Sequence, residues 1–212
     1  MPLHEINRKG PGNAWAVWVI TETEDWLFRQ VVPSDACPSQ LHHPKKRLEW
    51  LAGRYLIRYL YELDGIPYRG LDKDGSGKPF PIGHRGHVSV TNSFPWVAVQ
   101  IHPDRPVGID LETLRPRMVD VVTRILNSEE AKDAGTDTRK HGVYWCAKEA
   151  LFKWSGRRPV SLRSDISVGP FVMADRGLLS GTVLDEGGRR QTVDLEYLAE
   201  NDHIMVVTRY SN

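Results

Sequence analysis

The chain of 212 residues has the composition of an ordinary folded protein, with 40% hydrophobic residues, 26% charged residues and a net charge of +1. This balance excludes an intrinsically disordered chain, and the small net charge excludes recruitment of nucleic acid or an anionic membrane by a global electrostatic field. A polyanionic ligand would have to be bound by a local cluster of basic residues.

The first half of the chain predicts one strand, one helix and two further strands. The β-branched and aromatic run 14–20 is typical of a buried strand. Residues 46–63 place apolar side chains at steps of three and four, which indicates an amphipathic helix. Its apolar residues are Leu48, Leu51, Ala52, Tyr55, Tyr59 and Leu63. The segments that follow are a turn-rich loop at 72–79 and strands at 88–91 and 96–101.

The predicted order of strands and helices is interrupted at 102–106 and then begins again. Two prolines within 102–106 cannot continue either neighbouring element, so this segment is predicted to be a linker. The elements expected after it are a strand at 107–112, helices at 118–134 and 141–154, and strands at 166–173, 178–184, 192–198 and 203–209.

Each half thus runs strand, helix, strands. This order predicts an α+β protein of two pseudo-symmetric lobes, each a small sheet packed with helices. The expected N-terminal lobe spans 1–105 and the C-terminal lobe spans 106–212.

Cysteine usage and the N-terminus indicate a cellular compartment. Cys37 and Cys146 lie far apart and without metal-ligand spacing, which argues against a disulfide scaffold or a zinc site. The first residues carry an early acid, Glu5, and no apolar segment, and no run approaches the roughly 20 apolar residues of a membrane span. We therefore expect a cytoplasmic protein without a membrane or nucleic-acid partner.

Two carboxylates lie two residues apart in the strand expected at 107–112. Side chains alternate across a strand, so Asp110 and Glu112 point to the same face and could hold a hard cation together. The same pair is also found on the solvated side of an ordinary edge strand, and the apolar Ile109 and Leu111 fit both interpretations.

The helix expected at 141–154 carries a second candidate group. Trp145, Glu149 and Lys153 follow one another at four-residue spacing beside the predicted core stripe. The core stripe consists of Val143, Ala147, Ala150, Leu151 and Trp154. Glu149 and Lys153 could form only a surface ion pair, but the large aromatic ring one turn earlier favours a partly buried cleft.

Three features of the first half could bind an anion. Arg47, Arg54 and Arg58 fall in one basic sector of the first helix, although a solvated helix face has the same pattern. The run Gly77-Lys78-Pro79 places a lysine on a loop whose glycines let backbone N–H groups approach an anion. The run 91–93 offers three short hydrogen-bonding side chains between strands, where an ordinary turn is the alternative.

The order and spacing of these groups resemble a known family. The run Gly108-Ile109-Asp110-Leu111-Glu112, followed by Trp145-x-x-Lys148-Glu149-x-x-x-Lys153, resembles the paired signature of the 4′-phosphopantetheinyl transferases. Upstream, Ala52-Gly53-Arg54, Gly77-Lys78-Pro79 and the stretch 89–93 resemble the remaining motifs of the larger, surfactin-synthetase-activating type. The resemblance covers about residues 47–158.

The resemblance implies a fold, a metal and a co-substrate. In that family two α+β lobes bind coenzyme A, and three acids bind magnesium, which implies Asp110, Glu112 and Glu149 as Mg²⁺ ligands here. Glu149 and Lys153 are the implied catalytic residues. The residues expected to contact coenzyme A are Arg47, Arg54, Lys73, Lys78, Pro79, Thr91, Asn92, Asp110, Lys148 and Lys153.

Two positions qualify the resemblance. Asn92 stands where the family usually has a histidine, and the preceding serine is Thr91. Asparagine donates a hydrogen bond to phosphate but carries no positive charge, so we expect coenzyme A affinity to be affected. Glu130 matches a further family acid and is a candidate for the network of metal-bound water.

The implied activity is Mg²⁺-dependent transfer of 4′-phosphopantetheine from coenzyme A to a serine of an acyl or peptidyl carrier protein, of the holo-[acyl-carrier-protein] synthase type. Carrier domains are usually acidic, so a basic surface is expected, with Arg157, Arg158 and Arg163 as members. A monomer is expected. The alternatives are an inactive homologue that binds coenzyme A or a carrier protein, and a Mg²⁺-dependent phosphohydrolase.

Overall fold

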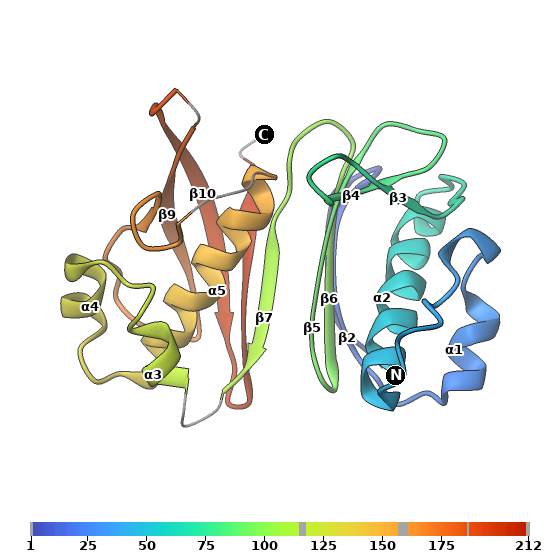
Figure 1. Ribbon diagram of the computed structural model, residues 1–212, viewed down its shortest axis with the longest axis horizontal. Helices are drawn as coiled ribbons and strands as arrows, with labels where there is room; N and C mark the ends of the chain where they lie inside the picture. Colours follow the sequence, from blue (N-terminus) through green and yellow to red (C-terminus); the bar gives the residue numbers. More distant parts are fainter. Residues whose placement is uncertain (1, 115–117, 157–160, 186, 211–212) are drawn as a thin grey trace. The chain divides into compact units, whose positions relative to one another are not determined.

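The computed structural model describes residues 2–114, 118–156, 161–185 and 187–210. The chain divides into two compact units, Met1–Val107 and Gly108–Asn212. Each unit is a mixed sheet-and-helix layer structure, as the predicted α+β fold class requires (Figure 1). Within the described residues, no helix combines the length and apolar character needed to cross a bilayer.

The N-terminal unit is an antiparallel sheet with helices on one face (Figure 1). Its four-stranded sheet has the order β1-β2-β6-β5, and a separate two-stranded sheet pairs β3 with β4. The elements are β1 (Leu3–Gly10), β2 (Asn13–Val19), α1 (Glu24–Gln30), a 3₁₀ turn (Pro33–Asp35), α2 (Pro44–Leu63), β3 (Leu71–Lys73), β4 (Pro79–Pro81), β5 (His87–Ser93) and β6 (Trp96–His102).

Helix α2 supplies the core of this unit. Pro44 occupies its first turn, where a missing backbone N–H costs nothing. The apolar face that packs on the sheet is fully buried at Leu51, Ala52, Leu56, Ile57 and Leu60. Tyr55 and Tyr59, which the sequence assigned to the core stripe, are only half-buried, and Leu63 is exposed. The buried stripe is therefore rotated from the predicted one, and two tyrosines lie at its edge.

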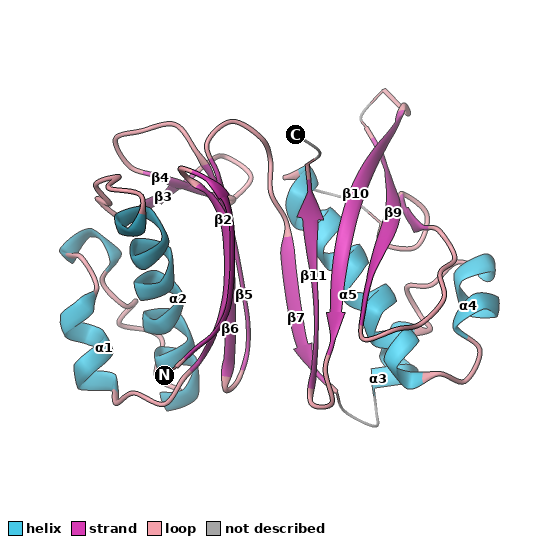
Figure 2. Ribbon diagram, turned by 180° about the vertical axis from the view of Figure 1, so that it is seen from behind, coloured by secondary structure: helices cyan, strands magenta, loops and turns pink. Residues whose placement is uncertain are grey.

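The C-terminal unit has one five-stranded antiparallel sheet of order β7-β11-β10-β9-β8, with α5 against one face (Figure 2). Helix α4 begins with a capping box between Asn127 and Glu130, and α5 is capped by Asp137. The elements are β7 (Ile109–Thr113), α3 (Met118–Val122), α4 (Ser128–Ala134), α5 (Thr138–Ser155), β8 (Ile166–Val168), β9 (Arg176–Leu184), β10 (Arg190–Ala199) and β11 (His203–Arg209).

Several predicted elements differ from the structure. The single helix expected at 118–134 is wrong, because the chain leaves α3 after Val122 and Asn127 caps a new helix. The strand expected at 166–173 ends at Val168, because Pro170 follows shortly after and cannot donate to the ladder. The run 91–93 is not a turn but the end of β5.

Three strands and one helix of the N-terminal unit have no counterpart in the sequence prediction. Strand β1 is rich in polar and charged residues and pairs only with β2, so it lacks the apolar signal of a core strand. Helix α1 has only 7 residues, and β3 and β4 have 3 residues each within the segment expected as a loop.

Candidate active site

Strand β7 presents its two carboxylates to the helix side of the sheet. In the pairing of β7 with β11, Asp110 lies opposite Val206 and Glu112 lies opposite Ile204. Paired residues share a face, and both apolar partners belong to the core that includes α5. Asp110 is buried and Glu112 is half-buried, so this is not the freely solvated side of an edge strand.

Helix α5 brings a glutamate and a lysine to the same face. Lys153 Nζ donates to Asp110 Oδ1 at 2.8 Å and to the carbonyl oxygen of Ile109 at 3.0 Å. The side chain of Lys153 is 27% exposed, whereas that of Asp110 is 6% exposed. Glu149 lies one turn earlier on α5 and is half-buried. The predicted row of Glu149 and Lys153 therefore adjoins the predicted strand pair.

Gly108 permits this close approach of helix and strand. A Cβ at this position would lie 1.9 Å from the carbonyl oxygen of Ala150 and 2.8 Å from the backbone nitrogen of Trp154. The Gly108 N–H donates to Thr208 Oγ1 at 3.1 Å, and its carbonyl accepts from the Thr208 N–H at 2.9 Å. The glycine that starts the acidic motif is thus required by packing, and Thr208 fixes its position.

The site carries more negative than positive charge. The pKa of Glu149 is raised, chiefly by burial and then by the neighbouring Asp110, while Lys153 opposes the shift and Glu112 adds to it. Three carboxylates close enough to influence one another, with one lysine, form a donor set that suits a hard divalent cation. The described residues do not, however, bring oxygens of all three within 4.8 Å of one another.

Cys146 belongs to the same helix face and was not predicted there. Its buried thiol has a raised pKa, because of burial first and then the charges of Asp110 and Glu112. The Sγ atom also lies 3.6 Å from the carbonyl oxygen of Ile204. The spacing of Cys146 and Lys153, two helical turns apart, could have indicated their shared face.

Lys148 does not fit a contact with coenzyme A, and that prediction is wrong. Its side chain is 0% exposed, and Nζ binds Glu130 Oε2 at 2.8 Å and the carbonyl oxygens of Leu162 at 2.7 Å and Ile166 at 2.6 Å. All three of its N–H donors are thereby satisfied inside the core. The pKa of Lys148 is lowered by burial, which its bond to Glu130 opposes.

Glu130 is likewise a structural residue rather than part of a metal-water network. Its Oε2 accepts from the Asn127 N–H at 2.8 Å in addition to Lys148, and its Oε1 accepts from the Val168 N–H at 2.9 Å. The side chain is 1% exposed. With both oxygens bonded to groups of the core, this carboxylate is closed to metal-bound water.

The Gly77-Lys78-Pro79 run of the N-terminal unit forms a tight turn between β3 and β4. Gly77 has φ +85°, a conformation that favours glycine. Asp74 Oδ1 accepts from the Lys78 N–H at 2.9 Å. Burial lowers the pKa of Lys78 to about 8, and Asp74 partly opposes this. Lys73 is exposed and pairs with Pro79 across this hairpin.

Thr91 and Asn92 lie next to each other near the end of β5 and so point to opposite faces of the sheet. Thr91 is buried and Asn92 is exposed. Only Asn92, the residue at the family's histidine position, is accessible to solvent.

The three arginines of α2 are each engaged by groups of their own unit. Arg47 forms an ion pair with Glu24 at 2.6 Å, and Arg58 forms one with Glu62 at 2.7 Å. Arg54 is buried, lies 3.3 Å from Asp35 Oδ1 and stacks over the Trp50 ring at 4.0 Å. The Arg54 side chain is 9% exposed, so little of it is accessible for the predicted contact with coenzyme A.

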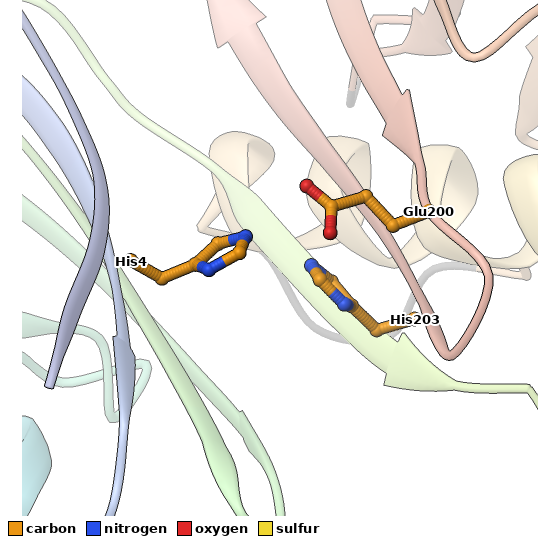
Figure 3. A group of neighbouring side chains, drawn as sticks. All are labelled: His4, Glu200 and His203. Carbon is orange, nitrogen blue, oxygen red and sulfur yellow. The ribbon is translucent and has the colours of Figure 1, made fainter.

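A further group of metal-ligand type lies at the β10–β11 turn. Figure 3 shows the Glu200 carboxylate and the His203 imidazole pointing towards each other across that turn. The Glu200 N–H donates to the carbonyl oxygen of His203 at 2.9 Å, and His203 Nδ1 lies 2.8 Å from Asp202 Oδ1. His4, also drawn there, belongs to β1 of the N-terminal unit. These local contacts tie the turn together.

Comparison with known proteins points to one family. Residues 106–189 match the sequence model of the 4′-phosphopantetheinyl transferase superfamily. The chain is 28% identical over 116 residues to 4′-phosphopantetheinyl transferase psf-1 of Bacillus pumilus, with 50% of this chain and 49% of that protein covered. It is 27% identical over 128 residues to 4′-phosphopantetheinyl transferase Sfp of Bacillus subtilis (strain 168), with 56% of each covered. The chain spans about half the length of the curated relatives it matches.

Proposed function

Since its C-terminal unit belongs to the 4′-phosphopantetheinyl transferase superfamily, we propose that this chain transfers the 4′-phosphopantetheine group of coenzyme A to a serine of a carrier protein. The observation that carries the proposal is the cluster of Asp110, Glu112, Glu149 and Lys153, formed by β7 and α5 inside the matched region. Two sheet-and-helix units support the larger, two-lobed type.

Asp110, Glu112 and Glu149 would hold Mg²⁺. The donor set consists of oxygens only, and the raised pKa of Glu149 reflects burial and like charges that a divalent cation would compensate. When bound, the ion supplies neutralisation of the charge on the coenzyme A diphosphate. Lys153 already compensates part of the charge of Asp110 through its 2.8 Å contact.

The reaction requires one bond to form and one to break. The serine oxygen bonds to the phosphorus that carries pantetheine, and the bond from that phosphorus to the bridging oxygen of the diphosphate breaks, releasing 3′,5′-ADP. Glu149 would accept the serine proton, directly or through a water molecule. Lys153, one turn further on α5, would stabilise or protonate the leaving oxygen.

The nucleotide would be bound by residues of the N-terminal unit. We assign the phosphate contacts to Lys78 on the β3–β4 turn and to the Thr91–Asn92 step of β5. The exposed Lys73 and the half-buried Arg47 would be additional cations. An exposed Asn92 supports a direct ligand contact. Replacing it by His, the usual family residue, is expected to keep or tighten coenzyme A binding below the unperturbed His pKa of about 6.5.

The acceptor would be an acyl or peptidyl carrier protein, which makes the activity that of a holo-[acyl-carrier-protein] synthase type enzyme. Carrier domains are acidic, and the exposed Arg163 would belong to the basic surface that receives them. Arg157 and Arg158 lie outside the described residues. The free thiols of Cys37 and Cys146 support a reducing, cytoplasmic location, and we propose a monomer.

One incubation tests the proposal against its alternatives. The protein is mixed with Mg²⁺, coenzyme A and an apo-acyl carrier protein, and all products are identified by mass spectrometry. A mass gain of one phosphopantetheine on the carrier, lost in excess EDTA, is the expected result. Unmodified carrier with intact coenzyme A would indicate a binding homologue, and nucleotide cleavage without carrier modification would indicate a phosphohydrolase.

A further inference from the structure

The N-terminal unit has an aromatic pocket that the transfer reaction does not use. The pocket has a volume of about 350 Å³, within the ~300–1,000 Å³ range of small-molecule sites. Helix α1 lies beside α2 (Figure 1). The pocket is lined from these two helices, from β2 and from the start of β1. Four aromatic rings and one carboxylate line it: Trp18, Trp26, Tyr55, Tyr59 and Glu22.

Neighbouring rings of the pocket have steep interplanar angles. The Trp18 and Tyr55 centroids are 5.3 Å apart with planes at 78°, and those of Trp26 and Tyr55 are 5.3 Å apart at 79°. The Trp18 and Tyr59 centroids are 6.3 Å apart, with their planes at 61°. Each of these pairs meets edge to face, and together the four rings give the pocket an aromatic lining of the kind that binds quaternary ammonium groups.

The pocket also contains a carboxylate, that of Glu22, which can supply a negative charge. Glu22 Oε2 accepts from Trp18 Nε1 at 3.3 Å and from the Thr21 N–H at 3.0 Å, which holds the side chain at the pocket. Its Oε1 makes no hydrogen bond within the described part of the chain. Burial raises the pKa of Tyr55, and nearby Tyr59 and Glu22 add to the shift.

The pocket is not filled by a cation of its own unit. In residues 2–114, no lysine or arginine lies over any of the four rings. The nearest basic residue in sequence, Arg58, pairs instead with Glu62 and with the carbonyl oxygen of Gln30. Trp26 remains 41% exposed, so the pocket is accessible from solvent.

We infer that this aromatic cage binds an alkylammonium group, with the methyl groups against the four rings and the positive charge near Glu22. The same chemistry is offered by a free quaternary ammonium compound such as choline and by a methylated lysine side chain of a protein. The inference is independent of the proposed transfer, because none of these residues belongs to the acidic cluster.

Calorimetric titration of the full chain tests this inference with a matched pair of ligands. Choline carries a trimethylammonium group, and 3,3-dimethylbutan-1-ol is its neutral isostere. A trimethyllysine-containing peptide and its unmethylated form make the second pair. In at least one pair, we expect the ligand with the trimethylammonium group to bind at least about tenfold more tightly than the other ligand of the pair, because cation–π attraction is strongest in desolvated cages. Tighter binding of choline would identify a small ligand, and tighter binding of the methylated peptide a protein ligand.

Variants of the wall residues localise the binding. Trp26→Leu and Glu22→Gln should each weaken binding of the preferred cation about tenfold or more. Tyr55→Phe keeps the ring and should bind like the wild type. Phe28→Leu, which changes an exposed aromatic residue of α1 outside the pocket, is the matched control. Equal affinity for the two members of both pairs, no saturable binding of any cation, or full binding by a correctly folded Trp26→Leu protein would each overturn the inference.

Discussion

Helix α5 carries three lysines that each pair with a carboxylate, and the pairs of Lys148 and Lys153 differ in their burial and in the charges around them. The pair of Lys148 and Glu130 is fully buried, has one charge of each sign, and uses every donor of the lysine. The pair of Lys153 and Asp110 is partly exposed and has Glu149 and Glu112 as additional acids.

This difference separates a structural ion pair from a reactive one. A buried pair in which every lysine donor and both carboxylate oxygens are bonded within the core is closed to a ligand, and its role is to hold α5, α4 and β8 together. A cluster with excess acid retains an electrostatic cost that a divalent cation relieves. The predictions below test that distinction at each residue.

The largest effect is expected from Asp110→Ala. Carrier modification should fall below detection, because a cation ligand and the partner of Lys153 are both lost. The melting temperature should hold or rise, since removing one acid from an acidic cluster relieves repulsion. Asp194→Ala changes an exposed aspartate of the same sheet and is the control for both measurements. Undiminished transfer in Asp110→Ala would remove this residue from the site.

Glu149→Gln should lower turnover by roughly 10²- to 10⁴-fold, the usual contribution of a general base, with little change in carrier-protein affinity. Lys153→Ala should also lower turnover but leave magnesium affinity nearly unchanged. The double variant should be less impaired than the product of the single effects, because both residues act on one transition state. Strict multiplicativity would show independent roles, and near-normal turnover in Glu149→Gln would refute the assignment.

Lys148→Met should act on stability instead of catalysis. It leaves Glu130 charged and buried without its cation, which typically costs roughly 3–5 kcal/mol. The free energy of unfolding is measured by denaturant titration, and turnover is measured on the protein that remains folded. The double variant Lys148→Met/Glu130→Gln should recover part of the loss. A stable Lys148→Met protein with abolished turnover would place this lysine in the reaction after all.

Lys78 of the N-terminal unit is a half-buried lysine that we propose binds a ligand. With a pKa of about 8 it is charged below that pH and neutral above it. Coenzyme A affinity should therefore fall about tenfold between pH ~7 and pH ~9. Lys78→Arg stays charged and should abolish this dependence, whereas Lys73→Arg should retain it. A pH-independent affinity of the wild type would exclude Lys78 from the phosphate site.

The sequence predicted the parts of this site that follow from short-range periodicity. The shared face of Asp110 and Glu112 follows from the two-residue repeat of a strand, and the row of Glu149 and Lys153 from the four-residue step of a helix. Lys148 was placed wrongly because it is adjacent to Glu149 in sequence, yet one step along a helix turns the side chain by about 100°. This rotation directs the Lys148 side chain into the core.

The other differences between the sequence prediction and the structure can also be explained. The run 127–130 has the form of a capping box, so Asn127 could have been recognised as the start of a new helix and Glu130 as its capping partner. The burial of Arg54 against Asp35 depends on a contact 19 residues away in the chain, which no local pattern contains. Strand β1 was missed because its residues are mostly polar.

Divalent-cation binding by the acidic cluster is measured by Mn²⁺ titration followed by electron paramagnetic resonance. Mn²⁺ serves as the oxygen-seeking probe, and coenzyme A is present throughout. We expect a single saturable ion in the wild type and in Asp194→Ala. Binding should be at least about tenfold weaker in Glu112→Gln, which keeps the side-chain shape but loses the charge. Wild-type affinity for Mn²⁺ in a folded Glu112→Gln protein would contradict it.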